Sequence, residues 1–279
     1  VTRADFDGVV AGGLLIELGK VDEIFFAEPK EMQDGNVAIS DNDITTNLPY
    51  VEGVHLCFDH HLSETVRVGE RENHIIEANA PSAARVVYNY YGGKETFTSI
   101  PDALMEAVDK ADSAQYSEAD ILAPDPWTLL NFMLDPRTGL SRFGHFDISN
   151  EQLMKDMMIY CRHHPVEEIL KIPDVEQRLH LYEEHEEAAE MQIKRCATIH
   201  SNLVVVDLRH EELIFAGNRF MVYAIYPECN ISIQVVPHSD GERTILATGK
   251  SILDRSSKTK IGPLMLEYGG GGHDAAGTC

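Results

Sequence analysis

Short apolar runs alternate with helical patterns through residues 1–125, and this alternation restricts the fold more than any other feature of the sequence. It is typical of parallel strands joined by helical crossovers. The predicted strands lie at residues 23–27, 36–40 and 54–58, and the predicted helices at residues 9–18, 82–91 and 100–114. We therefore predict an α/β domain with a parallel sheet over residues 1–125.

The pattern changes after residue 125. Residues 126–200 are helical in character and rich in charge, with one long helix predicted at residues 174–200, so we predict a helical linker. Four strands are then predicted, at residues 203–208, 220–226, 231–236 and 244–248. A last helix is predicted at residues 261–268. This order predicts a second, smaller α+β domain over residues 201–279.

The five cysteines are scattered and include no Cys-x-x-Cys pair. This spacing favours reduced thiols and a cytoplasmic setting over a disulfide framework or a cysteine-rich zinc site. No apolar run reaches the ~20 residues that a membrane span needs. The chain starts without an initiator Met and inside an expected strand, so we expect that a few N-terminal residues are missing.

The formal net charge of −23 bears on the partners. A surface of this sign repels a long phosphate backbone, and the sequence shows no basic stripe of the kind that binds duplex nucleic acid. A small anionic substrate is still compatible, because bound cations reverse the sign locally. We therefore expect a small phosphorylated substrate or a short oligonucleotide, no long duplex and no membrane partner, and the sequence leaves a homodimer open.

Acidic side chains follow three of the predicted strands. Asp5 and Asp7 follow the truncated first strand, Asp41 follows residues 36–40, and Asp59 follows residues 54–58 and precedes two histidines. The carboxyl ends of parallel strands form the ligand crevice of an open sheet, so these groups are expected to meet there. Crowded carboxylates with an imidazole favour bound Mn²⁺ or Mg²⁺.

Each of these motifs also has a simpler interpretation. Asp5-Phe6-Asp7-Gly8 is a good helix-capping turn, and Ser40-Asp41-Asn42-Asp43 is a good turn sequence. Asp59-His60-His61 is harder to explain by packing alone. The metal-site prediction therefore depends on the coincidence of these motifs at one sheet edge.

The motifs resemble those of the DHH family of phosphoesterases. Phe58-Asp59-His60-His61-Leu62 looks like the signature that names the family. Further matches to the family's N-terminal motifs are Asp5, Asp7, Asp41 and Asp112. Gly269-Gly270-Gly271-Gly272-His273, with Ala276 and Gly277, resembles the DHHA1 domain that accompanies the DHH domain. The resemblance spans nearly the whole chain in the family's motif order.

The resemblance implies a centre of two Mn²⁺ ions, with Mg²⁺ as an alternative. The implied metal ligands are Asp5, Asp7, Asp41, Asp59, His60 and Asp112. Asp41 is the expected bridging carboxylate, and Asp109 is an alternative to Asp112. Asp59, His60 and His61 are the implied catalytic residues, with His61 contacting the substrate or orienting His60. Many relatives have a histidine where this chain has Val1, which weakens the expected first ion.

The resemblance also implies a substrate-binding surface in the second domain. Its expected members are Arg255, Gly270, Gly271, Gly272 and His273. Glycines let backbone N–H groups approach a phosphate closely, and the forked donors of arginine suit the same ligand. We expect this domain to close on the substrate during catalysis.

These features predict a two-metal phosphoesterase. The substrates that fit the family are a short oligonucleotide, 3′-phosphoadenosine phosphate, a cyclic dinucleotide and polyphosphate; relatives include nanoRNase-type oligoribonucleases and exopolyphosphatases. One alternative is a haloacid-dehalogenase-like phosphatase in which Asp5 is the nucleophile. The other is a non-catalytic sensor of nucleotide or polyphosphate with a degraded metal site.

Overall fold

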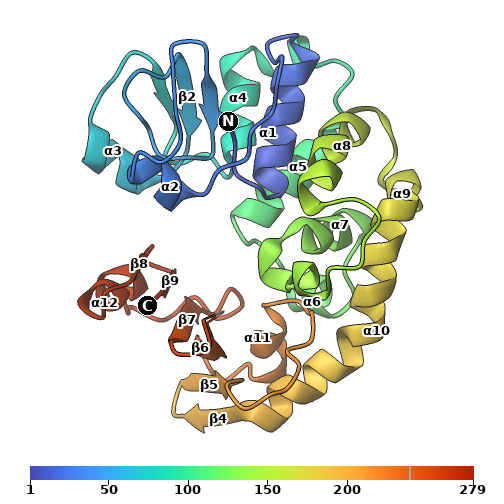
Figure 1. Cartoon of the computed structure of the whole chain (residues 1–279), viewed down its shortest axis with the longest axis vertical. Helices are drawn as coiled ribbons and strands as arrows, with labels where there is room; N and C mark the ends of the chain where they lie inside the picture. Colours follow the sequence, from blue (N-terminus) through green and yellow to red (C-terminus); the bar gives the residue numbers. More distant parts are fainter. Residues whose placement is uncertain (239) are drawn as a thin grey trace. The chain divides into compact units, whose positions relative to one another are not determined.

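Residues 1–238 and 240–279 are described by a computed structural model, in which they divide into two units (Figure 1). The first unit contains residues Val1–Gln115, Asp125–Pro136 and Ser141–Leu179. The second contains residues Tyr116–Pro124, Arg137–Leu140 and His180–Cys279. Within the described chain, no helix is both long and apolar enough to span a lipid bilayer.

The first unit has a three-stranded parallel sheet in the order β1-β2-β3. The strands are β1 (Ile44–Thr46), β2 (Leu56–Asp59) and β3 (His74–Ile76). Isolated parallel bridges connect Thr2 to both Phe26 and Thr46, so the start of the chain runs alongside β1. The predicted parallel α/β architecture is confirmed, and Asp59 is the last residue of its central strand.

Two of the predicted strands are wrong. The run at residues 23–27 is reduced to the single bridge at Phe26, and residues 36–40 form no strand. Val37 and Ile39 instead pack against a small apolar cluster that includes Met32 and Leu48. Their alternation therefore reflects packing without backbone pairing.

Helices pack against this sheet and against one another. The buried α1 (Phe6–Glu17) lies beside α4 (Ala83–Tyr90) and α5 (Asp102–Asp112). The bounds of these helices agree closely with the three helices predicted from the sequence. The shorter helices are α2 (Pro29–Gln33), α3 (Leu62–Val68) and the 3₁₀ turn η1 (Gly93–Glu95). Ser82 caps α4 as the sequence predicts, because its hydroxyl accepts a hydrogen bond from the Arg85 N–H at 3.0 Å.

Most of the expected linker packs into the first unit. Its helices there are α7 (Pro126–Leu134), α8 (Asn150–His163) and α9 (Val166–Ile169). The 3₁₀ turns η2 (Pro136–Thr138) and η3 (Leu140–Phe143) overlap residues 137–140, which belong to the second unit. Leu130, Leu153 and Met157 belong to the same apolar core as Phe6 and Leu14. The long predicted helix is α10 (Pro173–Cys196), which continues from the first unit into the second.

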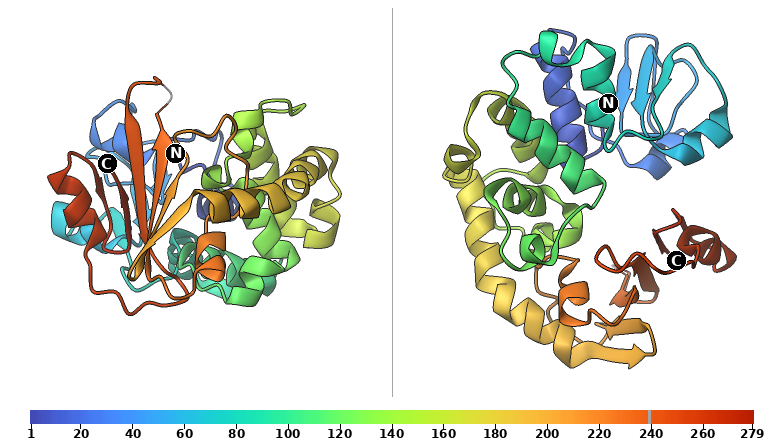
Figure 2. Two further views of the ribbon diagram at one scale, coloured as in Figure 1. Left: turned by 90° about the horizontal axis from the view of Figure 1, so that it is seen from below. Right: turned by 180° about the vertical axis from the view of Figure 1, so that it is seen from behind.

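The second unit is built on a six-stranded sheet in the order β4-β5-β6-β7-β9-β8 (Figure 2). The strands are β4 (Ala197–His200), β5 (Leu203–Asp207), β6 (Ile231–Pro237), β7 (Thr244–Lys250), β8 (Gly271–Gly272) and β9 (Ala276–Thr278). Only β5 and β6 pair in parallel; the other neighbours are antiparallel. The helices are α6 (Glu118–Leu122), α11 (Met221–Ile225) and α12 (Ile261–Glu267).

The strand predicted at residues 220–226 is wrong, because this segment forms α11. A short apolar run has no periodicity that separates a buried strand from a buried helix. Three consecutive side chains, Met221, Val222 and Tyr223, are buried, which an alternating strand with one solvated face would not show.

Candidate metal centre

Asp59 ends β2 with a fully buried carboxylate. Its Oδ1 accepts hydrogen bonds from the N–H groups of His60 at 2.8 Å and His61 at 3.2 Å, and lies 2.6 Å from His61 Nδ1. Its Oδ2 is buried and has no hydrogen-bond partner among residues 1–238 and 240–279. A buried carboxylate oxygen without a donor is strongly unfavourable, so this atom calls for a cation.

The two N-terminal acids lie where α1 begins. Asp5 caps the helix, because its Oδ1 accepts a hydrogen bond from the Gly8 N–H at 2.9 Å. Asp7 is buried and accepts hydrogen bonds from the N–H groups of Ala83 at 2.9 Å and Ala84 at 2.7 Å. These donors belong to the first turn of α4, whose dipole favours a negative charge. Asp5-Phe6-Asp7-Gly8 is therefore a capping turn and also brings two acids to this edge.

Burial raises the pKa of Asp7 well above its ordinary value, and the neighbouring carboxylates of Asp112 and Asp5 raise it further. His60 and the Ala84 N–H act in the opposite direction without cancelling the shift. A carboxylate in this position repels its acidic neighbours. A bound divalent cation would remove that repulsion.

His60 connects the acids at this edge. Its Nδ1 lies 3.1 Å from the Ala80 carbonyl oxygen, and its Nε2 lies 3.0 Å from Asp112 Oδ2. Asp7, His60 and Asp112 each offer one ligand atom within 4.8 Å of the other two. Burial lowers the pKa of His60, but Asp112, Asp7 and the Ala80 carbonyl together raise it to about 9. Without a cation, these neighbours favour a protonated imidazole at His60; a bound metal ion would take the place of the proton on Nε2.

The structure distinguishes Asp112 from Asp109. Asp109 accepts hydrogen bonds from Ser82 Oγ at 2.8 Å and from Arg85 Nε at 2.9 Å, and both pairs hold α4 against α5. Asp112 instead lies beside His60. The carboxylate that joins the cluster is therefore the preferred Asp112.

Asp41 does not join the cluster. It is exposed and lies in a turn where Asp43 accepts hydrogen bonds from the N–H and hydroxyl of Ser40, each at 2.7 Å. The turn precedes β1, at the amino end of a strand parallel to β2. Asp59 lies at the carboxyl end of β2, so the structure does not bring Asp41 and Asp59 to the same strand end, as the sequence had predicted.

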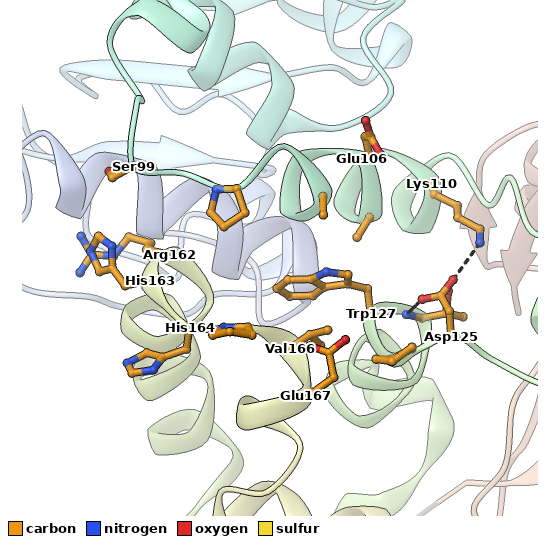
Figure 3. Close-up of a pocket in the computed structure, with 16 residues that line it drawn as sticks. Ser99, Glu106, Lys110, Asp125, Trp127, Arg162, His163, His164, Val166 and Glu167 are labelled. Carbon is orange, nitrogen blue, oxygen red and sulfur yellow. Dashed lines mark hydrogen bonds and ion pairs between the residues drawn. The ribbon is translucent and has the colours of Figure 1, made fainter.

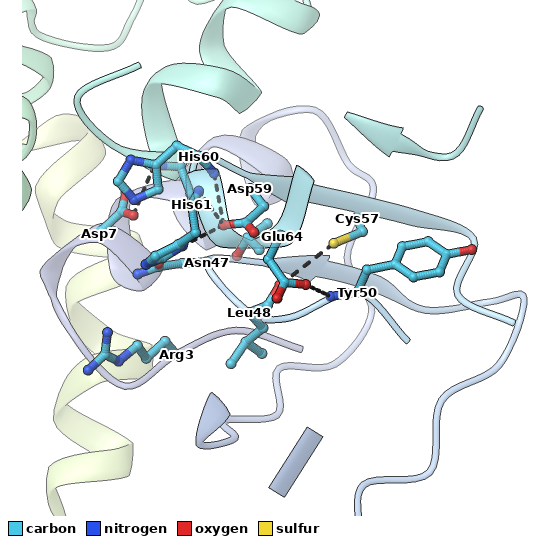
Figure 4. A network of polar contacts seen from close by, with 12 residues as sticks. Arg3, Asp7, Asn47, Leu48, Tyr50, Cys57, Asp59, His60, His61 and Glu64 are labelled. Atoms are coloured by element: carbon cyan, nitrogen blue, oxygen red, sulfur yellow. Dashed lines mark hydrogen bonds and ion pairs between the residues drawn. The ribbon is translucent and has the colours of Figure 1, made fainter. Parts of the chain in front are cut away.

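Asn47 occupies the position that Asp41 was expected to fill. It directly follows β1, is only 1% exposed, and donates through Nδ2 to Asp5 Oδ1 at 3.2 Å and Oδ2 at 3.3 Å. Figure 4 draws it in one polar network with Asp59 and His61. The signal in the sequence is the β-branched run Ile44-Thr45-Thr46 followed by Asn, a residue that tolerates the left-handed backbone found here at φ 54°.

The glycine run of the second unit has mainly an internal role. After α12, Gly269 adopts φ 81°, and its N–H donates to the Leu266 carbonyl at 3.1 Å. The Gly270 N–H donates to the Met265 carbonyl at 2.9 Å, which completes a Schellman cap. A Cβ at Gly270 would lie 1.9 Å from the Thr278 carbonyl oxygen. Gly270 is therefore required by close backbone packing, and its N–H is not available to cradle a phosphate.

The other predicted substrate contacts lie on the same unit. The His273 N–H donates to the Ala276 carbonyl at 2.7 Å, so only its exposed side chain is suited to a ligand. Arg255 is also exposed, and its Nε donates to the Ile252 carbonyl at 3.2 Å. The substrate-binding roles of Gly271, Gly272, His273 and Arg255 stay predictions.

A separate pocket of about 760 Å³ lies in the first unit, with Trp127 in its wall (Figure 3). Its basic side chains already have acidic partners: Arg162 lies 2.5 Å from Glu17, and Lys110 lies 3.3 Å from Asp125. These ion pairs neutralise the charge that a phosphate would need. The pocket is therefore a poor candidate for the phosphoester site.

Comparisons with known proteins include an informative match to a solved structure. No protein-family model and no curated protein matches the chain. A solved structure of the pGpG-specific phosphodiesterase PggH from Vibrio cholerae is 52% identical, with a TM-score of 0.86, and the match covers 100% of this chain and 91% of that one. An uncharacterized protein from Helicobacter pylori G27 covers 100% and 92%, but its 11% identity and TM-score of 0.32 carry no argument. By its likeness to PggH, the chain belongs to the DHH family of phosphoesterases.

Proposed function

We propose that this chain is a divalent-cation-dependent phosphodiesterase whose substrate is the linear dinucleotide pGpG. Water would replace the 3′ oxygen at the internal phosphorus, and the two products would be molecules of GMP. The 52% identity to a pGpG-specific enzyme supports this choice among the small phosphorylated substrates that the sequence predicts. The net charge of −23 also favours a short substrate over a long polyanion.

The observation that carries this proposal is the group of buried acids around His60. Asp7, His60 and Asp112 have ligand atoms within 4.8 Å of one another, and Asp59 Oδ2 is buried with no partner in the described part of the chain. Oxygen donors with one imidazole suit Mn²⁺ or Mg²⁺. We propose Asp5, Asp7, Asp59, His60 and Asp112 as the ligands of two such ions. When bound, the ions would supply an activated water and charge for the phosphoryl oxygens.

The surrounding residues hold these ligands in place. Two N–H groups of α4 fix the carboxylate of Asp7, and the Ala80 carbonyl holds His60 Nδ1 so that Nε2 turns toward Asp112. Asp59 Oδ1 fixes the backbone of both histidines. Such outer hydrogen bonds orient ligands and set the tautomer of the imidazole.

His61 is our candidate for contact with the reacting phosphate. Its Nδ1 is 2.6 Å from Asp59 Oδ1, and its side chain is 26% exposed. With Nδ1 held by this carboxylate, Nε2 is the atom that would reach the substrate. There it would donate a proton to the leaving 3′ oxygen.

In the second unit, we propose that Arg255 and the side chain of His273 bind substrate phosphate. Both are exposed, and arginine suits phosphate through its forked donors. Gly271 and Gly272 would shape the turn that presents His273.

The test is a substrate panel with and without Mn²⁺, analysed by chromatography for released mononucleotide. We expect pGpG to yield GMP with Mn²⁺ and no product after EDTA treatment. The panel should include pApA, 3′-phosphoadenosine phosphate, cyclic diadenylate and polyphosphate. Failure of pGpG to react with either Mn²⁺ or Mg²⁺ would overturn the proposal, and binding of pGpG without turnover would favour the sensor alternative.

The haloacid-dehalogenase alternative is contradicted by membership of the DHH family. The geometry of Asp5 agrees with this correction, since both of its carboxylate oxygens lie within 3.3 Å of Asn47 Nδ2. A nucleophile needs an oxygen directed at phosphorus. No phosphoaspartate at Asp5 is therefore expected in a trapping experiment.

A further inference from the structure

Asn47 has a buried oxygen that needs a partner. Its side chain is 1% exposed, and its Oδ1 has no hydrogen-bond partner within residues 1–238 and 240–279. Asp59 Oδ2 is in the same condition at the end of the neighbouring strand. These two buried acceptors lie at the ends of adjacent strands and accept no hydrogen bond. Burying them destabilises the fold unless a cation binds between them.

The orientation of the Asn47 amide follows from Asp5. The NH₂ group faces the Asp5 carboxylate at 3.2 and 3.3 Å, and the reversed amide would place oxygen against oxygen. Oδ1 therefore points away from Asp5. The backbone supports this placement, because Asn47 holds φ 54° and its N–H donates to the Phe58 carbonyl at 3.0 Å.

We infer that Asn47 Oδ1 is a cation ligand together with Asp59 Oδ2, in place of the carboxylate expected from Asp41. This inference rests on the proposed metal-dependent function. A carboxamide binds a hard cation through its oxygen and brings no charge. The acidic ligands then number four, Asp5, Asp7, Asp59 and Asp112, so their charge of −4 is balanced by two divalent ions of +4. A fifth carboxylate would leave the centre net negative before the anionic substrate arrives.

The amide has a second role that a carboxylate could not fill. Its NH₂ group restrains Asp5, whereas an aspartate at position 47 would place a negative oxygen about 3 Å from both Asp5 oxygens. Asn47 thus lets the centre hold its shape before a cation arrives.

The test is a titration of the full chain with Mn²⁺, following free Mn²⁺ by electron paramagnetic resonance. The variants are Asn47→Gly, which removes the ligand and keeps the left-handed backbone unstrained, and Asn47→Asp, which restores a charged ligand. Asn42→Gly, at an exposed asparagine before β1, is the matched control. Thermal unfolding in EDTA measures the state without metal.

We expect Asn47→Gly to raise the Mn²⁺ dissociation constant at least about 10-fold and Asn42→Gly to leave it unchanged. Asn47→Asp should bind Mn²⁺ more tightly and unfold at a lower temperature in EDTA. Equal Mn²⁺ affinity in wild type and both Asn47 variants would overturn the inference, as would a wild type that binds no Mn²⁺. Weakened binding in Asn47→Gly, combined with no turnover of pGpG by wild type, would overturn the proposed function and uphold the ligand role.

Discussion

The strand ends of the first unit and the glycine turn of the second unit carry motifs of similar clarity, but their polar groups are in opposite states. At the strand ends, Asp59 Oδ2 and Asn47 Oδ1 are buried without donors in the described chain. In the turn, the N–H groups of Gly270 and His273 already donate to backbone carbonyls. A motif whose groups are satisfied internally is explained by folding, whereas one that buries unsatisfied acceptors requires something from outside the chain.

The first prediction addresses the strand ends and has the largest expected effect. His60→Ala should lower Mn²⁺-dependent turnover of pGpG about 1,000-fold or more, because it removes the imidazole between Asp7 and Asp112. Such a loss corresponds to about 4 kcal/mol of transition-state stabilisation. Steady-state kinetics by chromatographic detection of GMP measures it.

His55→Ala is the matched control, because His55 is exposed in the same unit. It should retain wild-type kinetics, and both variants should unfold at nearly the temperature of wild type. Full activity in His60→Ala would contradict the assignment of the catalytic centre to the strand ends of the first unit. The difference between the two regions would then have no bearing on catalysis.

The second prediction concerns metal binding without turnover. Mn²⁺ at 100 times its dissociation constant should stabilise the folded chain by about 2.7 kcal/mol. For a unit of this size, that raises the unfolding temperature by about 5–10 °C. Asp59→Asn should lose most of this rise in unfolding temperature. The substitution replaces the carboxylate that contains the unpartnered Oδ2 by a neutral amide, which binds the ion less strongly.

Differential scanning calorimetry with Mn²⁺ and with EDTA measures this shift. An unfolding temperature that is the same in both conditions for wild type would mean that the buried acceptors are tolerated without a cation.

The third prediction addresses the glycine turn. Gly270→Ala should lower the free energy of unfolding by about 1–3 kcal/mol, because its Cβ would lie 1.9 Å from the Thr278 carbonyl oxygen. Gly271→Ala should change it by less than about 0.5 kcal/mol, since no atom lies within 4 Å of the added carbon. Urea unfolding monitors both variants.

Gly271→Ala also tests whether this turn contacts substrate. A KM for pGpG that rises severalfold at unchanged stability would uphold the predicted phosphate contact. An unchanged KM would assign the glycine run to folding alone.

The sequence predicted the parallel α/β fold and located Asp59 correctly, because β2 is a clear apolar run that ends in polar residues. The start of α4 was equally clear from Ser82. Asp7 was also predicted from the strand pattern, and it lies in the first turn of α1. Asp112 came from the family resemblance alone, since it lies at the end of a helix, α5.

The remaining errors have a physical cause. β1 has only three residues, too few to show a period, whereas the alternation of Val37 and Ile39 arises from packing against Met32. Choosing the wrong run placed the expected ligand at Asp41, whereas the residue that directly follows β1 is Asn47. The packing role of Gly270 could not be predicted for a similar reason: sequence spacing does not show that the backbone at Thr278 passes within contact of Gly270.

The smallest expected effect therefore belongs to Asp41. Asp41→Asn should leave the Mn²⁺ dissociation constant within about twofold of wild type, as for an ordinary surface substitution. Asp41 is exposed and precedes β1, so its charge lies at the opposite strand end from Asp59. The same Mn²⁺ titration that detects the loss in Asn47→Gly measures it. A tenfold loss of Mn²⁺ affinity in Asp41→Asn, with no loss in Asn47→Gly, would contradict this expectation. It would identify Asp41 as the cation ligand in place of Asn47.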